Sequence, residues 1–120
     1  MVERQTPMAK ILLAEDDPTM VSLLKTLLKM EGFDVIALDV YSDVAAAVEK
    51  EKPHALFMDV HLGGQNGMQI LESIRGNEGN SKVRVIMTSG MNMKDECISR
   101  GADVFLLKPF MPDDLIKALQ

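Results

Sequence analysis

Five short runs of apolar residues, separated by longer stretches with helical spacing, constrain the fold of this 120-residue chain more than any other feature. The runs cover residues 11–14, 35–38, 55–58, 83–87 and 104–107. Each run is too short for a helix and lacks the polar alternation of a half-exposed strand. Strands that are apolar on both sides need cover on both faces, which is typical of a parallel sheet packed between helices.

The stretches between the runs carry the signals of helices. In residues 18–31, Leu24 and Leu28 share one face at a spacing of 3.6 residues per turn. Asp17 can cap the free amides at the start of this helix, and Gly32 can adopt the left-handed conformation that ends it. Shorter helices are expected at residues 42–52, at 68–75, at 93–100 with Asn92 as a cap, and from residue 112 onward.

Strands that alternate with helices predict repeated βα units with right-handed crossovers. The expected fold class is therefore α/β, a (βα)5 doubly wound domain with a five-stranded parallel sheet and helices on both faces. We expect one domain over residues 8–120, with residues 1–7 as a loose leader or an expression remnant.

Charge and composition exclude several classes of function. The formal net charge of −5 opposes direct binding of this segment to the phosphate backbone of nucleic acids. The single cysteine, Cys97, cannot form an internal disulfide and has no second cysteine for a metal-binding pair. No apolar run has the length of a membrane span, and the N-terminus lacks the pattern of a signal peptide. We therefore expect a cytoplasmic domain without membrane association.

Polar residues follow the expected strands at positions suited to chemistry. Glu15 and Asp16 follow the first run, Asp59 the third, Thr88 the fourth and Lys108 the fifth. The carboxyl ends of parallel strands meet at one edge of the sheet, where ligands bind in such folds. Carboxylates gathered there would repel one another, whereas Mg²⁺ would hold them ionised. The ammonium of Lys108 and the hydroxyl of Thr88 could neutralise the oxygens of a transferring phosphoryl group, which makes Asp59 the expected nucleophile.

These motifs, in their order and spacing, resemble the receiver domain of two-component response regulators over residues 10–120. The motifs are ILLAEDDP at residues 11–18, Met58-Asp59, Asn66-Gly67, Thr88-Ser89, Gly101-Ala102-Asp103 and Lys108-Pro109-Phe110. The resemblance implies a flavodoxin-like sheet with the strand order 2-1-3-4-5. It also implies a domain that catalyses its own modification and is not a turnover enzyme.

The resemblance further implies the roles of the site residues. Asp59 would accept a phosphoryl group from a sensor histidine kinase or a phosphotransfer protein, while Thr88 and Lys108 bind its oxygens. The Mg²⁺ site would comprise Glu15, Asp16, Asp59 and the backbone carbonyl of His61, with Asp16 as a direct ligand.

Thr88 and Phe105 would act as a switch in this resemblance. Their movement would alter the face formed by the helix at 93–100, the strand at 104–107 and the last helix. A downstream effector or a fused output domain would recognise that face, which could also form a homodimer.

The chain departs from the family pattern in the loop after Asp59. Gly63 stands where the family commonly has proline, and Gly64 follows it, so we expect a mobile loop.

A haloacid-dehalogenase-like phosphatase would need an aspartate at position 61, where this chain has histidine. A flavodoxin-like FMN binder would need a phosphate-binding loop after the first strand, where this chain has three acidic residues. A phosphate-independent, receiver-like interaction module stays open as the alternative.

Overall fold

The computed structural model describes residues 9–120, and its central element is a five-stranded parallel sheet in the order β2-β1-β3-β6-β7. Its strands are β1 (Lys10–Ala14), β2 (Asp34–Leu38), β3 (Ala55–Asp59), β6 (Arg84–Ser89) and β7 (Val104–Leu107). Each strand covers one of the predicted apolar runs, except that β6 begins one residue after the start of the run at 83–87. The order is that of the flavodoxin-like 2-1-3-4-5 sheet, so the predicted fold class is confirmed. The predicted leader, residues 1–7, lies outside the described residues.

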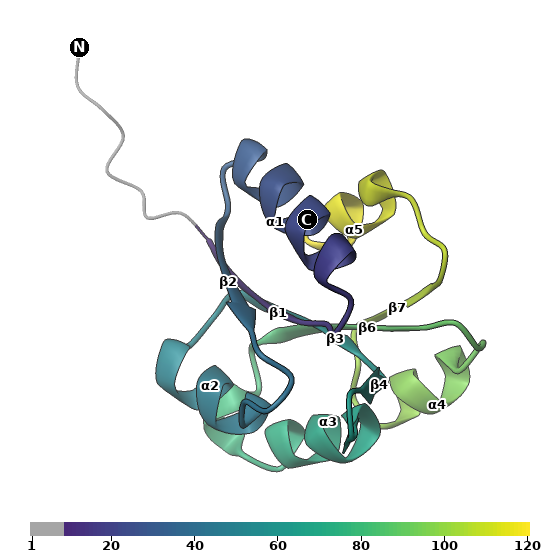
Figure 1. Cartoon of the computed structure of the whole chain (residues 1–120). Helices are drawn as coiled ribbons and strands as arrows, with labels where there is room; N and C mark the ends of the chain where they lie inside the picture. Colours follow the sequence, from purple (N-terminus) through teal and green to yellow (C-terminus); the bar gives the residue numbers. More distant parts are fainter. Residues whose placement is uncertain (1–8) are drawn as a thin grey trace.

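Helices cover both faces of this sheet (Figure 1). They are α1 (Pro18–Met30), α2 (Val44–Glu51), α3 (Gly67–Arg75), α4 (Lys94–Ser99) and α5 (Pro112–Ala118), with a short 3₁₀ helix η1 (Glu78–Asn80) after α3. Helices α1 and α5 pack on one face, and α2, α3 and α4 pack on the other. Over the described part of the chain, no helix combines the length and apolar character needed to cross a membrane.

The predicted signals explain where α1 begins and ends. The side chain of Asp17 accepts hydrogen bonds from the backbone amides of Thr19 at 2.9 Å and Met20 at 3.4 Å. Gly32 takes a φ of +94°, the left-handed conformation expected after the helix. For α4 the cap lies one residue later than predicted, because Met93 is the capping residue. Asn92 contributes instead by accepting from the amide of Lys94 at 3.2 Å.

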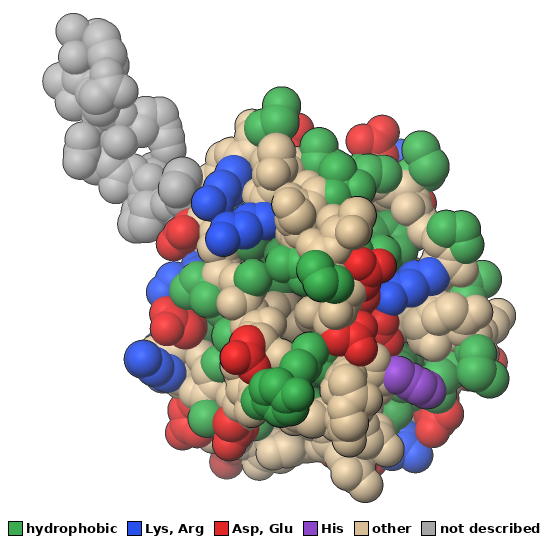
Figure 2. All heavy atoms as spheres, viewed as in Figure 1, with side chains coloured by type: hydrophobic (Ala, Val, Ile, Leu, Met, Phe, Trp, Pro, Cys, Tyr) green, Lys and Arg blue, Asp and Glu red, His purple; other side chains and the backbone are tan. Residues whose placement is uncertain are grey.

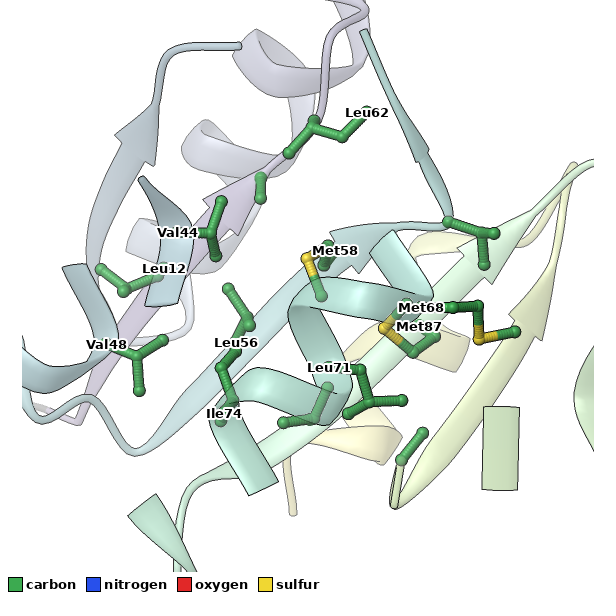
Figure 3. Packing of buried hydrophobic residues seen from close by; sticks show 14 of the residues in the cluster. Leu12, Val44, Val48, Leu56, Met58, Leu62, Met68, Leu71, Ile74 and Met87 are labelled. Carbon is green, nitrogen blue, oxygen red and sulfur yellow. The ribbon is translucent and has the colours of Figure 1, made fainter. Parts of the chain in front are cut away.

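Alternate residues of the strands build two apolar layers, because successive side chains point to opposite faces of a sheet. Figure 3 shows the layer beneath α2 and α3, where strand residues meet helix residues such as Val48 and Leu71. The opposite layer joins residues such as Phe57 to α1 and α5 through Leu24 and Leu115. Both layers are buried, which explains why the strands are apolar throughout and which holds their carboxyl ends at a common edge.

A short hairpin after β3 was not predicted. Strand β4 (His61–Leu62) pairs antiparallel with β5 (Gln65–Asn66), so that Gly63 and Gly64 form a two-residue turn. Gly63 has a φ of +57°, which is a conformation that two-residue hairpin turns require and that glycine adopts readily. The expected loose loop is therefore a defined hairpin at the edge of the sheet that carries the candidate site.

Candidate functional site

Three carboxylates meet at the carboxyl ends of β1 and β3. Glu15 and Asp16 directly follow β1, and Asp59 is the last residue of β3. Each offers one oxygen that lies within 4.8 Å of the others. Glu15 and Asp59 are buried, at 3% and 6% exposure, whereas Asp16 is exposed. Figure 2 shows acidic side chains gathered over this edge of the sheet beside a basic side chain.

Lys108 connects two of these carboxylates. Its Nζ donates to Glu15 Oε1 at 2.8 Å and to Asp59 Oδ2 at 2.5 Å. Among the four side chains predicted to form the charged site, one cation therefore faces three carboxylates. This imbalance favours a proton or a further cation at the site.

Burial and these contacts shift the titration of both partners. Burial raises the pKa of Glu15 to about 7, and the neighbouring Asp59 adds to the rise, while the hydrogen bond from Lys108 opposes it. Burial alone would lower the pKa of Lys108, but its bonds to Asp59 and Glu15 outweigh that effect and raise the pKa. Lys108 therefore stays charged at neutral pH, whereas metal-free Glu15 holds a proton to a higher pH than a free glutamate does.

The raised pKa of Glu15 predicts a pH-dependent stability of the metal-free domain. An acid whose pKa rises on folding, here from 4.5 to about 7, contributes stability fully below pH 4.5 and loses it as the pH rises through 7. The test is urea unfolding in EDTA. The free energy of unfolding of wild type should fall, relative to that of Glu15→Gln, as the pH rises from 5 to 8. Parallel curves for the two proteins over this range would contradict the raised pKa.

The donor set fits a hard divalent cation. Carboxylate oxygens are the ligands that Mg²⁺ prefers in proteins, and the exposure of Asp16 leaves the group open to solvent. The backbone amide of His61 donates to Asp59 Oδ1 at 2.8 Å, which fixes the start of β4 beside the carboxylate. The side chain of His61 is exposed. The roles of the His61 carbonyl and of Glu15 as metal ligands stay predictions.

Thr88 and Phe105, the two residues predicted to switch, lie on the neighbouring strands β6 and β7. Thr88 is fully buried at the register position next to Asp59, and its hydroxyl donates to the carbonyl of Leu106 in β7 at 2.7 Å. Phe105 is half-buried and packs against the apolar layer that contains Met87. The hydroxyl would have to leave Leu106 in order to bind a group carried by Asp59, so the switch role stays a prediction.

Three hydrogen bonds of the hairpin, made by two of its residues, were not predicted from the sequence. The amide of Gly63 donates to Asp16 Oδ2 at 3.1 Å, and the side chain of Gln65 donates to the carbonyls of Val40 and Ser42. A Gly-Gly pair is a recognised signal for a two-residue hairpin turn, so the hairpin itself could have been predicted. The Gln65 contacts span more than twenty residues of sequence and leave no local pattern.

Comparison with known proteins agrees with this geometry. The response regulator receiver domain family matches residues 11–120. Among curated relatives, the chain is 29% identical over 110 residues to the DNA-binding response regulator MtrA of Mycolicibacterium smegmatis. This match covers 89% of the chain but only 47% of MtrA, so the chain spans about half the length of that relative. Protein PilH of Pseudomonas aeruginosa is 28% identical over 115 residues, which cover 93% of this chain and 95% of PilH.

Solved structures show the same fold. The chemotaxis response regulator CheY4 of Vibrio cholerae superposes with a TM-score of 0.84 at 25% identity, covering 95% of this chain and 98% of that one. The receiver domain of the sensor histidine kinase PA1611 from Pseudomonas aeruginosa, with a magnesium ion coordinated in its active site cleft, gives a TM-score of 0.82 at 26% identity. That superposition covers 95% of this chain and 96% of the other. Because the family match covers nearly the whole chain and the sheet order agrees with it, this chain belongs to the response regulator receiver domain family.

Proposed function

We propose that this receiver domain accepts a phosphoryl group on Asp59, in a Mg²⁺-dependent transfer from a phosphohistidine of a sensor histidine kinase or a phosphotransfer protein. The observation that carries the proposal is the buried Asp59 carboxylate, held by Lys108 and within 4.8 Å of oxygens from Glu15 and Asp16. The magnesium ion in the receiver domain of PA1611 supports the choice of metal.

The transfer requires little chemistry beyond positioning and charge neutralisation. One oxygen of Asp59 forms a bond to phosphorus as the bond between phosphorus and the donor imidazole nitrogen breaks. The imidazole keeps the electron pair of that bond and takes up a proton. Asp16, Asp59 and the backbone carbonyl of His61 would hold Mg²⁺, with Glu15 completing the acidic pocket, and the ion would neutralise charge on the phosphoryl oxygens.

Lys108 and Thr88 would then rearrange to bind the phosphoryl group on Asp59. Lys108 can exchange its contact with Asp59 Oδ2 for a phosphoryl oxygen while it keeps Glu15. Thr88 can turn its hydroxyl from the carbonyl of Leu106 toward the same group. Both rearrangements act on β7 and on the segments beside it, so Phe105 and the α4-β7-α5 face would respond.

The α4-β7-α5 face is suited to a protein partner. It bears exposed apolar side chains at Leu107 in β7, Met91 before α4 and Met111 before α5. An effector, a fused output domain or a second copy of the domain could bury them. The net charge of −5 argues against direct contact of this segment with nucleic acid.

Intact-mass measurement with acetyl phosphate tests the phosphoacceptor role. Wild type should gain one phosphoryl group in Mg²⁺ and none in EDTA. Asp59→Asn should gain none under either condition, because its amide is a poor nucleophile. Asp16→Asn keeps the acceptor but weakens the metal site, so it should need more Mg²⁺ for the same gain.

Two outcomes would contradict this function. A mass gain that persists in Asp59→Asn would place the acceptor elsewhere. An unmodified wild type after rapid quenching would favour the phosphate-independent interaction module.

A further inference from the structure

We propose that Gln65 is a positioning residue for the metal and phosphoryl site. In this proposal, its side-chain amide anchors the β4-β5 hairpin to the loop between β2 and α2, residues 39–43. The anchor holds the hairpin groups that contact Asp16 and Asp59. This inference rests on the proposed phosphoacceptor function.

The amide of Gln65 makes two contacts across the sheet edge. Nε2 donates to the carbonyl of Val40 at 2.7 Å and to the carbonyl of Ser42 at 3.2 Å. An amide nitrogen carries two hydrogens, so these two acceptors use its full donor capacity. Gln65 is half-buried, which shields both bonds from competing water. The side chain therefore ties two separate loops together.

The anchored hairpin contributes two backbone donors to the charged site. The amide of His61, at its start, donates to Asp59 Oδ1 at 2.8 Å. The amide of Gly63, at its turn, donates to Asp16 Oδ2 at 3.1 Å. Gly63 also lies against the 39–43 loop, because a Cβ built on it would stand 3.3 Å from the Cβ of Val40. The position of the hairpin between Asp16 and Val40 thus determines how both carboxylates are held.

Gln65 supplies polar side-chain contacts that a two-residue hairpin alone lacks. The paired strands β4 and β5 contain two residues each, and so short a hairpin is at best marginally stable without further contacts. Without the amide, the hairpin would keep its turn but lose its bonds to the 39–43 loop. The two donors would then sample a wider range of positions, and Asp16 and Asp59 would be less well arranged for Mg²⁺.

Mg²⁺ titration followed by amide NMR tests this role directly. The amides of His61 and Gly63 report binding at the site, and those of Tyr41 and Ser42 report the loop. Gln65→Met has similar length and no donor, so its Mg²⁺ dissociation constant should rise about threefold to tenfold. If the loop affects Mg²⁺ binding, Mg²⁺ binding must affect the loop to the same extent. Mg²⁺ should therefore shift the NMR signals of the Tyr41 and Ser42 amides in wild type, and shift them less in the variant.

Two further variants separate positioning from a general loss of stability. Gln69→Met makes the same substitution at an exposed position on α3 and should bind Mg²⁺ like wild type. Gln65→Glu keeps the shape but places an acceptor against the two carbonyls, so it should weaken Mg²⁺ binding at least as much as Gln65→Met. Urea unfolding of each variant shows whether the affinity changes independently of stability.

The possible failures are distinguishable. Wild-type affinity in both Gln65 variants, whatever their stability, would overturn the positioning role while leaving the phosphoacceptor function intact. A wild-type domain that neither binds Mg²⁺ nor gains a phosphoryl group would overturn the proposed function and this inference with it.

Discussion

Replacing Gly67 with alanine should lower the free energy of unfolding by about 3 kcal/mol, which is the upper end of the usual cost of overpacking. A Cβ at this position would stand 2.6 Å from the carbonyl oxygen of Asp59, 2.8 Å from that of Val60 and 2.9 Å from the Cα of Val60. All three atoms belong to the backbone, so no flexible side chain can move aside. The amide of Gly67 also donates to the carbonyl of Val60 at 2.7 Å, which fixes this close approach.

The same substitution should impair the site, because the displaced backbone carries Asp59. Gly64→Ala is a matched control in the same segment, since a Cβ there meets nothing within 4 Å. We expect its unfolding free energy to lie within about 0.5 kcal/mol of wild type. Urea unfolding and the acetyl phosphate reaction provide the two measurements. Equal stability of Gly67→Ala and Gly64→Ala would show that the backbone around Asp59 yields more easily than these distances indicate.

Gly67 also shows what the sequence could and could not predict. The Asn66-Gly67 pair was recognised only as part of a family resemblance. The structure supplies two physical reasons for it: the Asn66 side chain caps α3 by accepting from the amide of Met68 at 2.9 Å, and Gly67 permits the close approach to β3. The cap follows from residue type and position, whereas the close approach depends on how two separate segments pack.

The fold was predictable because its signals are local. Continuous apolar runs mark the buried strands, and residues such as Asp17 and Gly32 mark the ends of a helix. The gathering of Glu15, Asp59 and Lys108 was predictable for a related reason, since parallel strands bring their carboxyl ends to one edge. Strand positions therefore determine which residues can meet.

The direction of individual side chains was less predictable. The Thr88 hydroxyl binds the carbonyl of Leu106, and Gln65 reaches two carbonyls in another loop. These contacts depend on rotamers and on the paths of loops, which leave no periodic pattern in the sequence. For the β4-β5 hairpin, the Gly-Gly pair was the one available signal, because strands of two residues are too short to show alternation.

Arg75 is the clearest case of a residue whose importance lies only in long-range contacts. In the sequence it is a basic residue at the end of a helix. In the structure its guanidinium joins the end of α3 to the segments before β6 and β7. It donates to the carbonyls of Gly101 at 2.8 Å, Val83 at 2.9 Å and Asn80 at 3.1 Å, and to Asp103 Oδ2 at 2.8 Å.

Arg75→Met should therefore lower the free energy of unfolding by about 3 kcal/mol, as expected when a charged donor of several shielded hydrogen bonds is lost. Methionine can fill part of the apolar space of the arginine stem but leaves the three carbonyls without this donor. The loss should be large because the Arg75 side chain is only 19% exposed, so water replaces few of its contacts. Urea unfolding at neutral pH measures the change.

Arg100→Met provides the matched control, because Arg100 is also ion-paired but more exposed. Its guanidinium contacts Glu72 at 3.1 Å and Glu96 at 3.2 Å, with 36% of its side chain exposed. Exposed ion pairs of this kind contribute about 0.2–1 kcal/mol each, so the substitution should cost far less than Arg75→Met. Raising the salt concentration should reduce the cost of Arg100→Met more than that of Arg75→Met, because salt screens exposed charges more than shielded ones. Similar costs and similar salt dependence for the two variants would mean that Arg75 acts as a surface charge and does not hold these segments together.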